Sequence, residues 1–162
     1  MLADRIKELT KLKQVVLFCD MDGVLVEYNI DQKSDIVNNV PKTYFNNRPL
    51  THTINNLKLL GQMPNVTVAI LSNCYHKEQR NEKIEWLKIH APFISQENVH
   101  IIVYAEQKFE KSSKDFLKAR KISEIIYGKD VVPILIEDNH EIIKATNSIL
   151  PNTAYHVSEI IG

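Results

Sequence analysis

The sequence predicts an α/β fold in which helices cover a doubly wound, mainly parallel, Rossmann-like sheet. Apolar runs at residues 15–19, 66–71 and 131–136 are short and rich in β-branched side chains, which is typical of buried strands. Segments with helical spacing of apolar residues separate these runs, and this alternation indicates a parallel sheet with helices on both faces. Because the 162 residues contain no linker or repeat, we expect a single domain over residues 1–162.

The other elements of the first half have signals of their own. Leucine and isoleucine recur at helical spacing in residues 1–13, which predicts a short amphipathic helix. A helix over residues 51–60 is expected to stop at Gly61, because glycine is common just after a helix. A second helix, over residues 77–90, is expected to end before Pro92.

The second half continues the same alternation. Residues 99–104 predict a third strand. Ser112 or Ser113 can cap a following helix, with Asp115 placed for a capping box three residues after Ser112. A short helix after the fourth strand and an edge strand over residues 153–157 complete the expected fold.

Bulk composition disfavours several classes of partner. Twenty basic residues balance 20 acidic ones, so no overall field attracts nucleic acid or an anionic membrane. No run approaches the roughly 18 apolar residues that a membrane span requires. Two cysteines, Cys19 and Cys74, do not make a disulfide framework. We therefore expect a cytoplasmic protein with reduced thiols and no membrane partner, and the balanced charge disfavours a nucleic-acid partner.

The most informative local feature is a pair of aspartates at the end of the first predicted strand. Asp20 and Asp22 flank one residue, and Gly23 follows them. Open α/β sheets bind ligands outside the carboxyl ends of their strands, so both carboxylates are expected at a ligand site. One carboxylate could attack phosphorus and the other could move protons, while Mg²⁺ holds the phosphate between them.

Four segments together resemble a known family. The D-x-D-G-V stretch that begins at Asp20 resembles the first motif of the haloacid dehalogenase (HAD) superfamily, a large group of phosphohydrolases with an aspartate nucleophile. Ser72 and Asn73, after the strand at 66–71, are similar to its second motif. Glu137 and Asp138, after the strand at 131–136, are similar to its acidic fourth motif. The resemblance implies a HAD-like fold.

The resemblance also implies a role for each motif residue. Asp20 would be the nucleophile that forms an aspartyl phosphate. Asp22 would protonate the leaving-group oxygen and then deprotonate water. Ser72 would donate its hydroxyl to a phosphate oxygen, and Asn73 could orient the substrate or cap the next segment.

A Mg²⁺ site follows from the same resemblance. Asp20 and the backbone carbonyl of Asp22 would bind the ion, and Asp138 with Glu137 would complete the oxygen ligands that a hard cation prefers. Of these last two residues, Asp138 is favoured as the direct ligand.

The third motif supplies a lysine, and several candidates compete for it. Lys111 is preferred because it precedes a plausible helix cap and its distance to Glu137 is similar to family spacing. Lys108 is the alternative, and Lys114 is expected to be solvated. The remaining cations nearby are interpreted as the solvated face of a helix. They are Lys118, Arg120 and Lys121.

These features predict a Mg²⁺-dependent phosphatase, a phosphomonoester hydrolase with a small phosphorylated substrate. Asp22 resembles the phosphatase and phosphomutase branches, because dehalogenase-like members lack this second aspartate. Residues 27–49, rich in Asn and Asp, predict only a short flap or minimal cap. A short flap lets water enter and thus favours hydrolysis over phosphoryl transfer to a second hydroxyl.

The substrate inference rests on a narrower resemblance. Residues 20–28 and 45–50 look similar to cytosolic deoxyribonucleotidases and their small bacterial or phage relatives. A nucleotide is therefore a candidate substrate: Tyr28, Tyr44 and Phe45 could stack on the base, and Arg48 could meet a second anion. The alternative function is a non-enzymatic metal- or phosphate-binding regulatory module of the same fold. The clustered carboxylates argue against it, because they repel each other without serving a purely structural purpose. A phosphatase that acts on nucleic-acid ends is a third possibility, and the neutral net charge argues against it.

Overall fold

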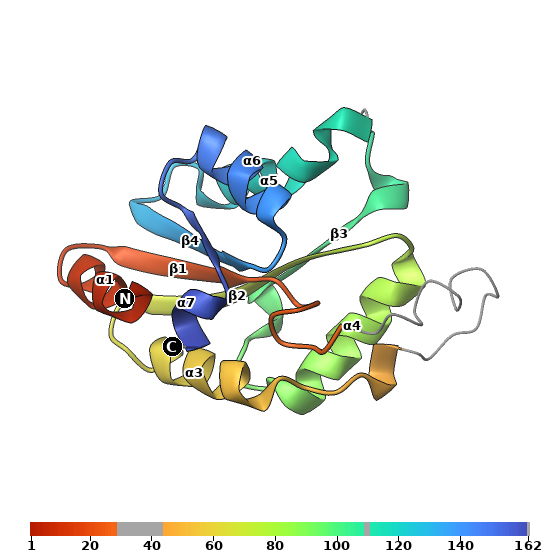
Figure 1. Ribbon diagram of the computed structural model, residues 1–162, viewed down its shortest axis with the longest axis horizontal. Helices are drawn as coiled ribbons and strands as arrows, with labels where there is room; N and C mark the ends of the chain where they lie inside the picture. The colour runs from red at the N-terminus through yellow and green to blue at the C-terminus, as the bar shows by residue number, and fades with distance from the viewer. Residues whose placement is uncertain (29–43, 109–110, 162) are drawn as a thin grey trace.

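The computed structural model describes residues 1–28, 44–108 and 111–161. Five strands form one sheet in the order β3-β2-β1-β4-β5, and every neighbouring pair is parallel (Figure 1). The α/β fold class predicted from the sequence is therefore confirmed. The strands are β1 (Gln14–Cys19), β2 (Val66–Cys74), β3 (Val99–Val103), β4 (Val131–Glu137) and β5 (Ala154–His156).

Helices cover both faces of this sheet. They are α1 (Leu2–Thr10), α3 (Thr51–Gly61), α4 (Lys77–His90), α5 (Leu117–Ile126), α6 (His140–Ile149) and α7 (Ser158–Ile161). Helices α5 and α6 pack on one face, and α1, α3, α4 and α7 pack on the other (Figure 1). The side chains of β1 alternate between the two cores: Leu17 and Cys19 belong to one core and Phe18 to the other. A strand buried on both faces explains the unbroken apolar run in the sequence.

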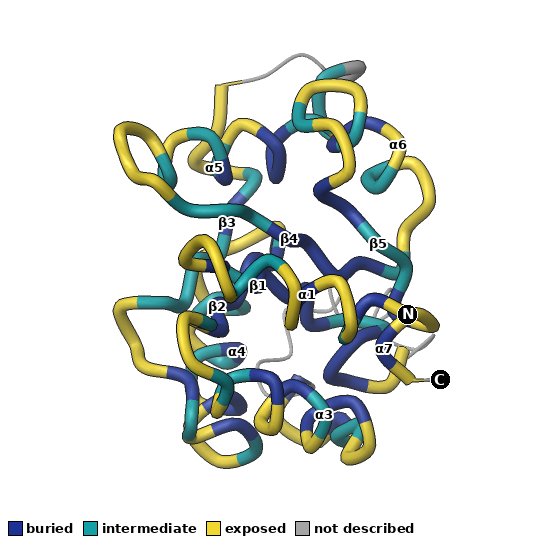
Figure 2. Tube along the Cα trace, turned by 90° about the vertical axis from the view of Figure 1, so that its left-hand side faces the viewer, coloured by how far each residue is buried: buried dark blue, intermediate teal, exposed yellow. Residues whose placement is uncertain are grey.

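The chain order places a ligand crevice at the centre of the sheet. The chain runs outward from β1 through β2 to β3 and then crosses to the other side of β1 for β4 and β5. Ligands of open α/β sheets bind outside the carboxyl ends of the strands where the order reverses, which here is between β1 and β4. The trace is buried along these central strands and exposed on the outer helices (Figure 2).

The predicted end of α3 is wrong by one residue, for a packing reason. Gly61 is the last helical residue, and Gln62 after it keeps a right-handed backbone with φ of −82°. A Cβ atom on Gly61 would lie 3.0 Å from Cγ2 of Val68 in β2. The glycine therefore lets α3 approach the sheet closely, rather than ending the helix in a left-handed conformation.

The predicted capping box before α5 is also wrong. Lys111–Phe116 forms a 3₁₀ helix, η4, and α5 begins only at Leu117 without a side-chain cap. The regular helix thus begins where the side chains become buried, at Leu117 and Lys118. By contrast, α6 has a side-chain cap, because Asn139 accepts hydrogen bonds from the backbone N–H groups of Glu141 and Ile142.

Most of the predicted flap at 27–49 lies outside the described residues, since 29–43 are not among them. Its two ends are described. Val26 pairs with Pro49 in an antiparallel bridge, and Tyr44 packs edge-on against Trp86 of α4 with ring centroids 6.4 Å apart. Among the described residues, no helix has the length and apolar character needed to cross a membrane.

Candidate active site

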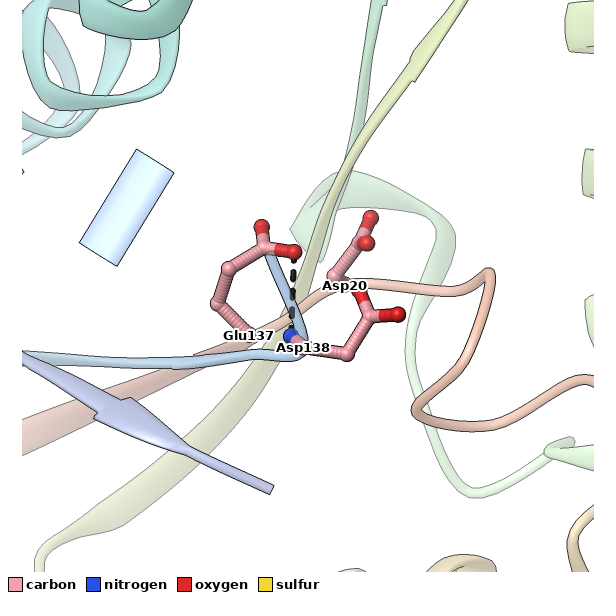
Figure 3. A group of neighbouring side chains, drawn as sticks. All are labelled: Asp20, Glu137 and Asp138. Atoms are coloured by element: carbon pink, nitrogen blue, oxygen red, sulfur yellow. Dashed lines mark hydrogen bonds between the residues drawn. The ribbon is translucent and has the colours of Figure 1, made fainter. Parts of the chain in front are cut away.

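Three carboxylates meet at the carboxyl ends of β1 and β4. Asp20 directly follows β1, and its backbone N–H donates to the carbonyl of Ile136 in β4 at 3.0 Å. Glu137 ends β4 and Asp138 follows it. One carboxylate oxygen from each of Asp20, Glu137 and Asp138 lies within 4.8 Å of the others (Figure 3). Parallel pairing in register brings these residues together across more than a hundred positions of sequence.

Both carboxylate oxygens of Glu137 accept hydrogen bonds from the protein itself. Its Oε1 accepts from the backbone N–H group of Asp138 at 3.1 Å (Figure 3). The same oxygen accepts from the backbone N–H group of Asn139, also at 3.1 Å. Its Oε2 accepts from the ammonium of Lys118 at 2.5 Å. Because both of its oxygens have partners, Glu137 acts as an anchor for the turn after β4. Asp138, half-buried beside it, is the better candidate for direct contact with a cation, as the sequence also suggested.

The lysine beside these carboxylates is Lys118, at the start of α5. Its ammonium is buried and lies 2.9 Å from Oδ1 of Asp20 as well as against Glu137. Burial alone would lower the pKa of Lys118, but the two carboxylates outweigh it and hold the pKa above the ordinary lysine value. Lys118 is therefore a fixed positive charge next to Asp20.

Sequence reasoning missed Lys118 by placing it on a solvated helix face. A signal was present, because Lys118 lies four residues before Ile122, and this spacing puts both on one face of a helix. Lys111, the preferred residue, lies in η4, where the structure does not describe its side chain, so that assignment stays a prediction. Lys108 is exposed. The ammonium of Lys114 lies over the rings of Tyr75 and Tyr104, 5.1 and 4.4 Å from their centroids.

The charge on Asp20 is only partly balanced by Lys118. The pKa of Asp20 is raised to about 7: burial raises it most, Glu137 and Asp22 also raise it, and Lys118 and Lys83 lower it. A carboxyl with a raised pKa is more stable when it is protonated or when a further positive charge lies beside it.

A second buried lysine, Lys83 of α4, contacts the three other predicted site residues. Its ammonium donates to Oδ2 of Asp22 at 2.8 Å, to Oγ of Ser72 at 2.9 Å and to the carbonyl of Asn73 at 2.9 Å. Ser72 and Asn73 lie near the carboxyl end of β2, and Ser72 is completely buried. Sequence analysis did not single out Lys83, since nothing local links it to Asp22, 61 residues away.

The loop that carries the two aspartates is tight. The carbonyl of Met21 accepts from the backbone N–H groups of Leu25 and Val26, at 2.8 and 3.0 Å. Gly23 has a φ of +76°, and a Cβ atom there would lie 2.1 Å from Oδ2 of Asp138. Glycine at this position therefore serves two purposes: it adopts the left-handed backbone, and it leaves room for the Asp138 carboxylate.

The site as a whole has the charge and donor set for one divalent cation. Two ammonium groups, from Lys83 and Lys118, face four carboxylates, from Asp20, Asp22, Glu137 and Asp138. When all are ionised, two negative charges remain. Carboxylate oxygens are the ligands that hard cations such as Mg²⁺ prefer, and the convergence of Asp20 and Asp138 fits such an ion.

Gly23→Ala is expected to abolish divalent-cation binding at this site, because the added methyl group takes the place of the Asp138 carboxylate. Gly128→Ala is the matched control: Gly128 also has a left-handed backbone, with φ of +71°, but a Cβ atom there meets nothing within 4 Å. Both variants carry the backbone strain of about 1 kcal/mol, and only the first carries the clash. Mg²⁺ titration by calorimetry of both variants measures the difference. Equal Mg²⁺ affinity in the two would contradict the assigned position of Asp138.

Comparisons with known proteins support the fold. Models of known protein families give no match to the sequence, and neither do curated proteins. Among solved structures, a chain of the Pnkp1/Rnl/Hen1 RNA repair complex is similar with a TM-score of 0.64 and 20% identity, covering 91% of this chain. Our chain spans only 43% of that protein.

Two further structures are similar over most of both chains. A haloacid dehalogenase-like hydrolase from Burkholderia xenovorans LB400 has a TM-score of 0.56 at 11% identity, with 89% of this chain and 81% of that one covered. The class C acid phosphatase from Bacillus anthracis with tungstate bound has a TM-score of 0.52 at 12% identity, with coverage of 99% and 81%. At these identities the likeness establishes a HAD-like, Rossmann-type fold.

Proposed function

We propose that this protein is a Mg²⁺-dependent phosphomonoester hydrolase that works through an aspartyl-phosphate intermediate. The observation that carries the proposal is the Asp20 carboxylate, which is buried beside the Lys118 ammonium and an Asp138 oxygen at the switch point of the sheet. The HAD-like fold supports it, since similar folds include a hydrolase and an acid phosphatase.

The reaction divides between the two aspartates. An oxygen of Asp20 forms a bond to phosphorus while the bond from phosphorus to the leaving oxygen breaks. Asp22 gives a proton to that leaving oxygen and then takes one from the water that hydrolyses the aspartyl phosphate. Asp20, Asp138 and the carbonyl of Asp22 would hold Mg²⁺, which supplies positive charge to the phosphate oxygens.

The buried lysine and serine support the phosphate and its nucleophile. Lys118 keeps a positive charge against Asp20, which lowers the repulsion between an attacking carboxylate and a phosphate dianion. This is the role that the family resemblance assigns to a third-motif lysine. Ser72 would donate its hydroxyl to a phosphate oxygen, and Asn73 would contact the substrate or order the β2 end.

A small phosphorylated metabolite is the proposed substrate class, with a nucleotide as the candidate. A cavity of about 260 Å³ is lined by residues that include Tyr28, Asn47 and Arg48. Tyr28 links this cavity to the carboxylates electrostatically, since burial and then the charges of Asp138 and Asp22 raise the pKa of its hydroxyl. A planar ring on Tyr28 and an anion on Arg48 suit a nucleotide. The proposal includes a minimal cap at 27–49 and a cytoplasmic location, with Cys19 and Cys74 as free thiols.

A panel of phosphorylated metabolites, together with p-nitrophenyl phosphate, tests this function on the purified protein. We expect turnover with Mg²⁺, its loss in EDTA and its return when Mg²⁺ is restored in excess. EDTA-resistant turnover would contradict the metal requirement. Absence of turnover, combined with Mg²⁺-dependent binding of inorganic phosphate, would favour the non-enzymatic binding module instead.

A further inference from the structure

Lys83 uses every donor of its ammonium group within the protein. An ammonium has three N–H groups, and three oxygens accept from this one: Asp22 Oδ2, Ser72 Oγ and the Asn73 carbonyl. No N–H donor is left for a phosphate oxygen. Any influence of Lys83 on a reaction at this site must therefore act through the groups that it holds.

The Lys83 ammonium is buried and held in one position by its neighbours. Its side chain is 4% exposed, and the ring of Tyr44 lies beneath the ammonium with the centroid 5.0 Å away. Lysine is normally found with its charge in water, so a buried ammonium with three hydrogen bonds marks a defined geometry. Lys83 thus ties α4, β2 and the loop after β1 together at one point.

The bond to Ser72 fixes what the hydroxyl can do. Because Lys83 donates to Oγ, the hydroxyl hydrogen of Ser72 points away from the ammonium and is available to donate to another acceptor. A phosphate oxygen bound in front of Asp20 would be such an acceptor. Towards a bound substrate, the Ser72 hydroxyl would therefore act as a hydrogen-bond donor rather than an acceptor.

The bond to Asp22 fixes which carboxylate oxygen can react. Lys83 holds Oδ2, so Oδ1 is the oxygen of this carboxylate that the ammonium leaves for proton exchange with the substrate. We propose that Lys83 is a positioning residue that aims Oδ1 of Asp22 at the leaving oxygen and the Ser72 hydroxyl at the phosphate. This inference rests on the proposed phosphatase function and adds a residue to it.

Lys83→Met removes the ammonium while keeping an unbranched side chain of similar length. The expected loss in kcat/KM is about 100-fold for glycerol phosphate, whose alkoxide needs a proton, because a misplaced general acid forfeits most of its effect. For p-nitrophenyl phosphate, which departs without a proton, the expected loss is about tenfold or less. Lys88→Met on the same helix is the matched control, since Lys88 is exposed and pairs with the exposed Glu85. It should leave both rates unchanged.

A double-mutant cycle separates positioning from general damage. In an Asp22→Asn background, Lys83→Met should no longer change the ratio of the two rates. In a Ser72→Ala background, it should no longer raise the inhibition constant of inorganic phosphate. Equal loss for both substrates, or the same change in rate ratio with and without the Asp22 carboxylate, would overturn the inference.

If the Lys83→Met variant melts below the assay temperature, Lys83→Gln replaces it and is tested by the same ratio of the two rates. A wild-type protein without turnover removes the proposed function and this role together, whereas uniform loss in an active protein removes only the role.

Discussion

Asp20→Asn is expected to lower turnover of every phosphomonoester by a factor on the order of 10⁴ or more, because it removes the nucleophile itself. The change replaces one carboxylate oxygen with an amide and keeps the side-chain shape. Lys118 retains its second partner, Glu137, so the fold should persist. The measurement is kcat with p-nitrophenyl phosphate and Mg²⁺, alongside a thermal melt of the same sample.

Asp130→Asn is the matched control for this prediction. Asp130 also pairs with a lysine, Lys13, but its side chain is 83% exposed and far from the strand ends that form the site. An exposed pair of this kind contributes about 0–1 kcal/mol, and its loss should not alter turnover. Retained activity in Asp20→Asn, or an equal loss in both variants, would contradict the assignment of Asp20 as nucleophile.

The strand framework could be predicted from sequence because its physical causes are local. A short run of β-branched residues buried on both faces leaves a clear apolar signal, and parallel strands in one sheet must end at the same edge. The convergence of Asp20 and Asp138 follows from these two facts. The resemblance in the first and fourth motifs pointed to the same residues, and the register of β1 against β4 agrees with it.

The two lysines could not be predicted in the same way, because their burial depends on distant partners. A lysine is buried only when its charge is paired, and the partners of Lys83 and Lys118 lie on other elements. Family spacing favoured Lys111, and a run of cations made Lys118 resemble a solvated surface. Only the packing of α5 against β4 distinguishes Lys118 from its neighbours.

The predicted helix boundaries were wrong for a related reason. Glycine after an apolar stripe commonly ends a helix, yet Gly61 continues α3 because its missing side chain allows contact with Val68. The serines before α5 offered a good cap, but the helix starts where burial starts, at Leu117. Tertiary packing outweighs a local signal in both cases.

Lys118→Met is expected to have the largest effect on stability and to lower turnover by a factor of about 10² or more. Removing one partner of a buried ion pair leaves its charges uncompensated, which typically costs about 3–5 kcal/mol. Here two carboxylates, Asp20 and Glu137, lose their cation. Turnover falls because no fixed positive charge then offsets the repulsion between Asp20 and the phosphate. Urea unfolding and kcat with saturating Mg²⁺ measure the two effects.

Two lysine variants and one double variant make this prediction specific. Lys121→Met lies on the same helix and removes an i,i+3 pair with Glu124, so it should cost less than about 1 kcal/mol. Adding Glu137→Gln to Lys118→Met removes one of the unpaired charges and should recover part of the stability without recovering turnover. Lys111→Met tests the assignment made from the sequence. If Lys111→Met abolishes turnover while Lys118→Met leaves it intact, the buried lysine is a structural group, and the family spacing was the better guide to the catalytic one.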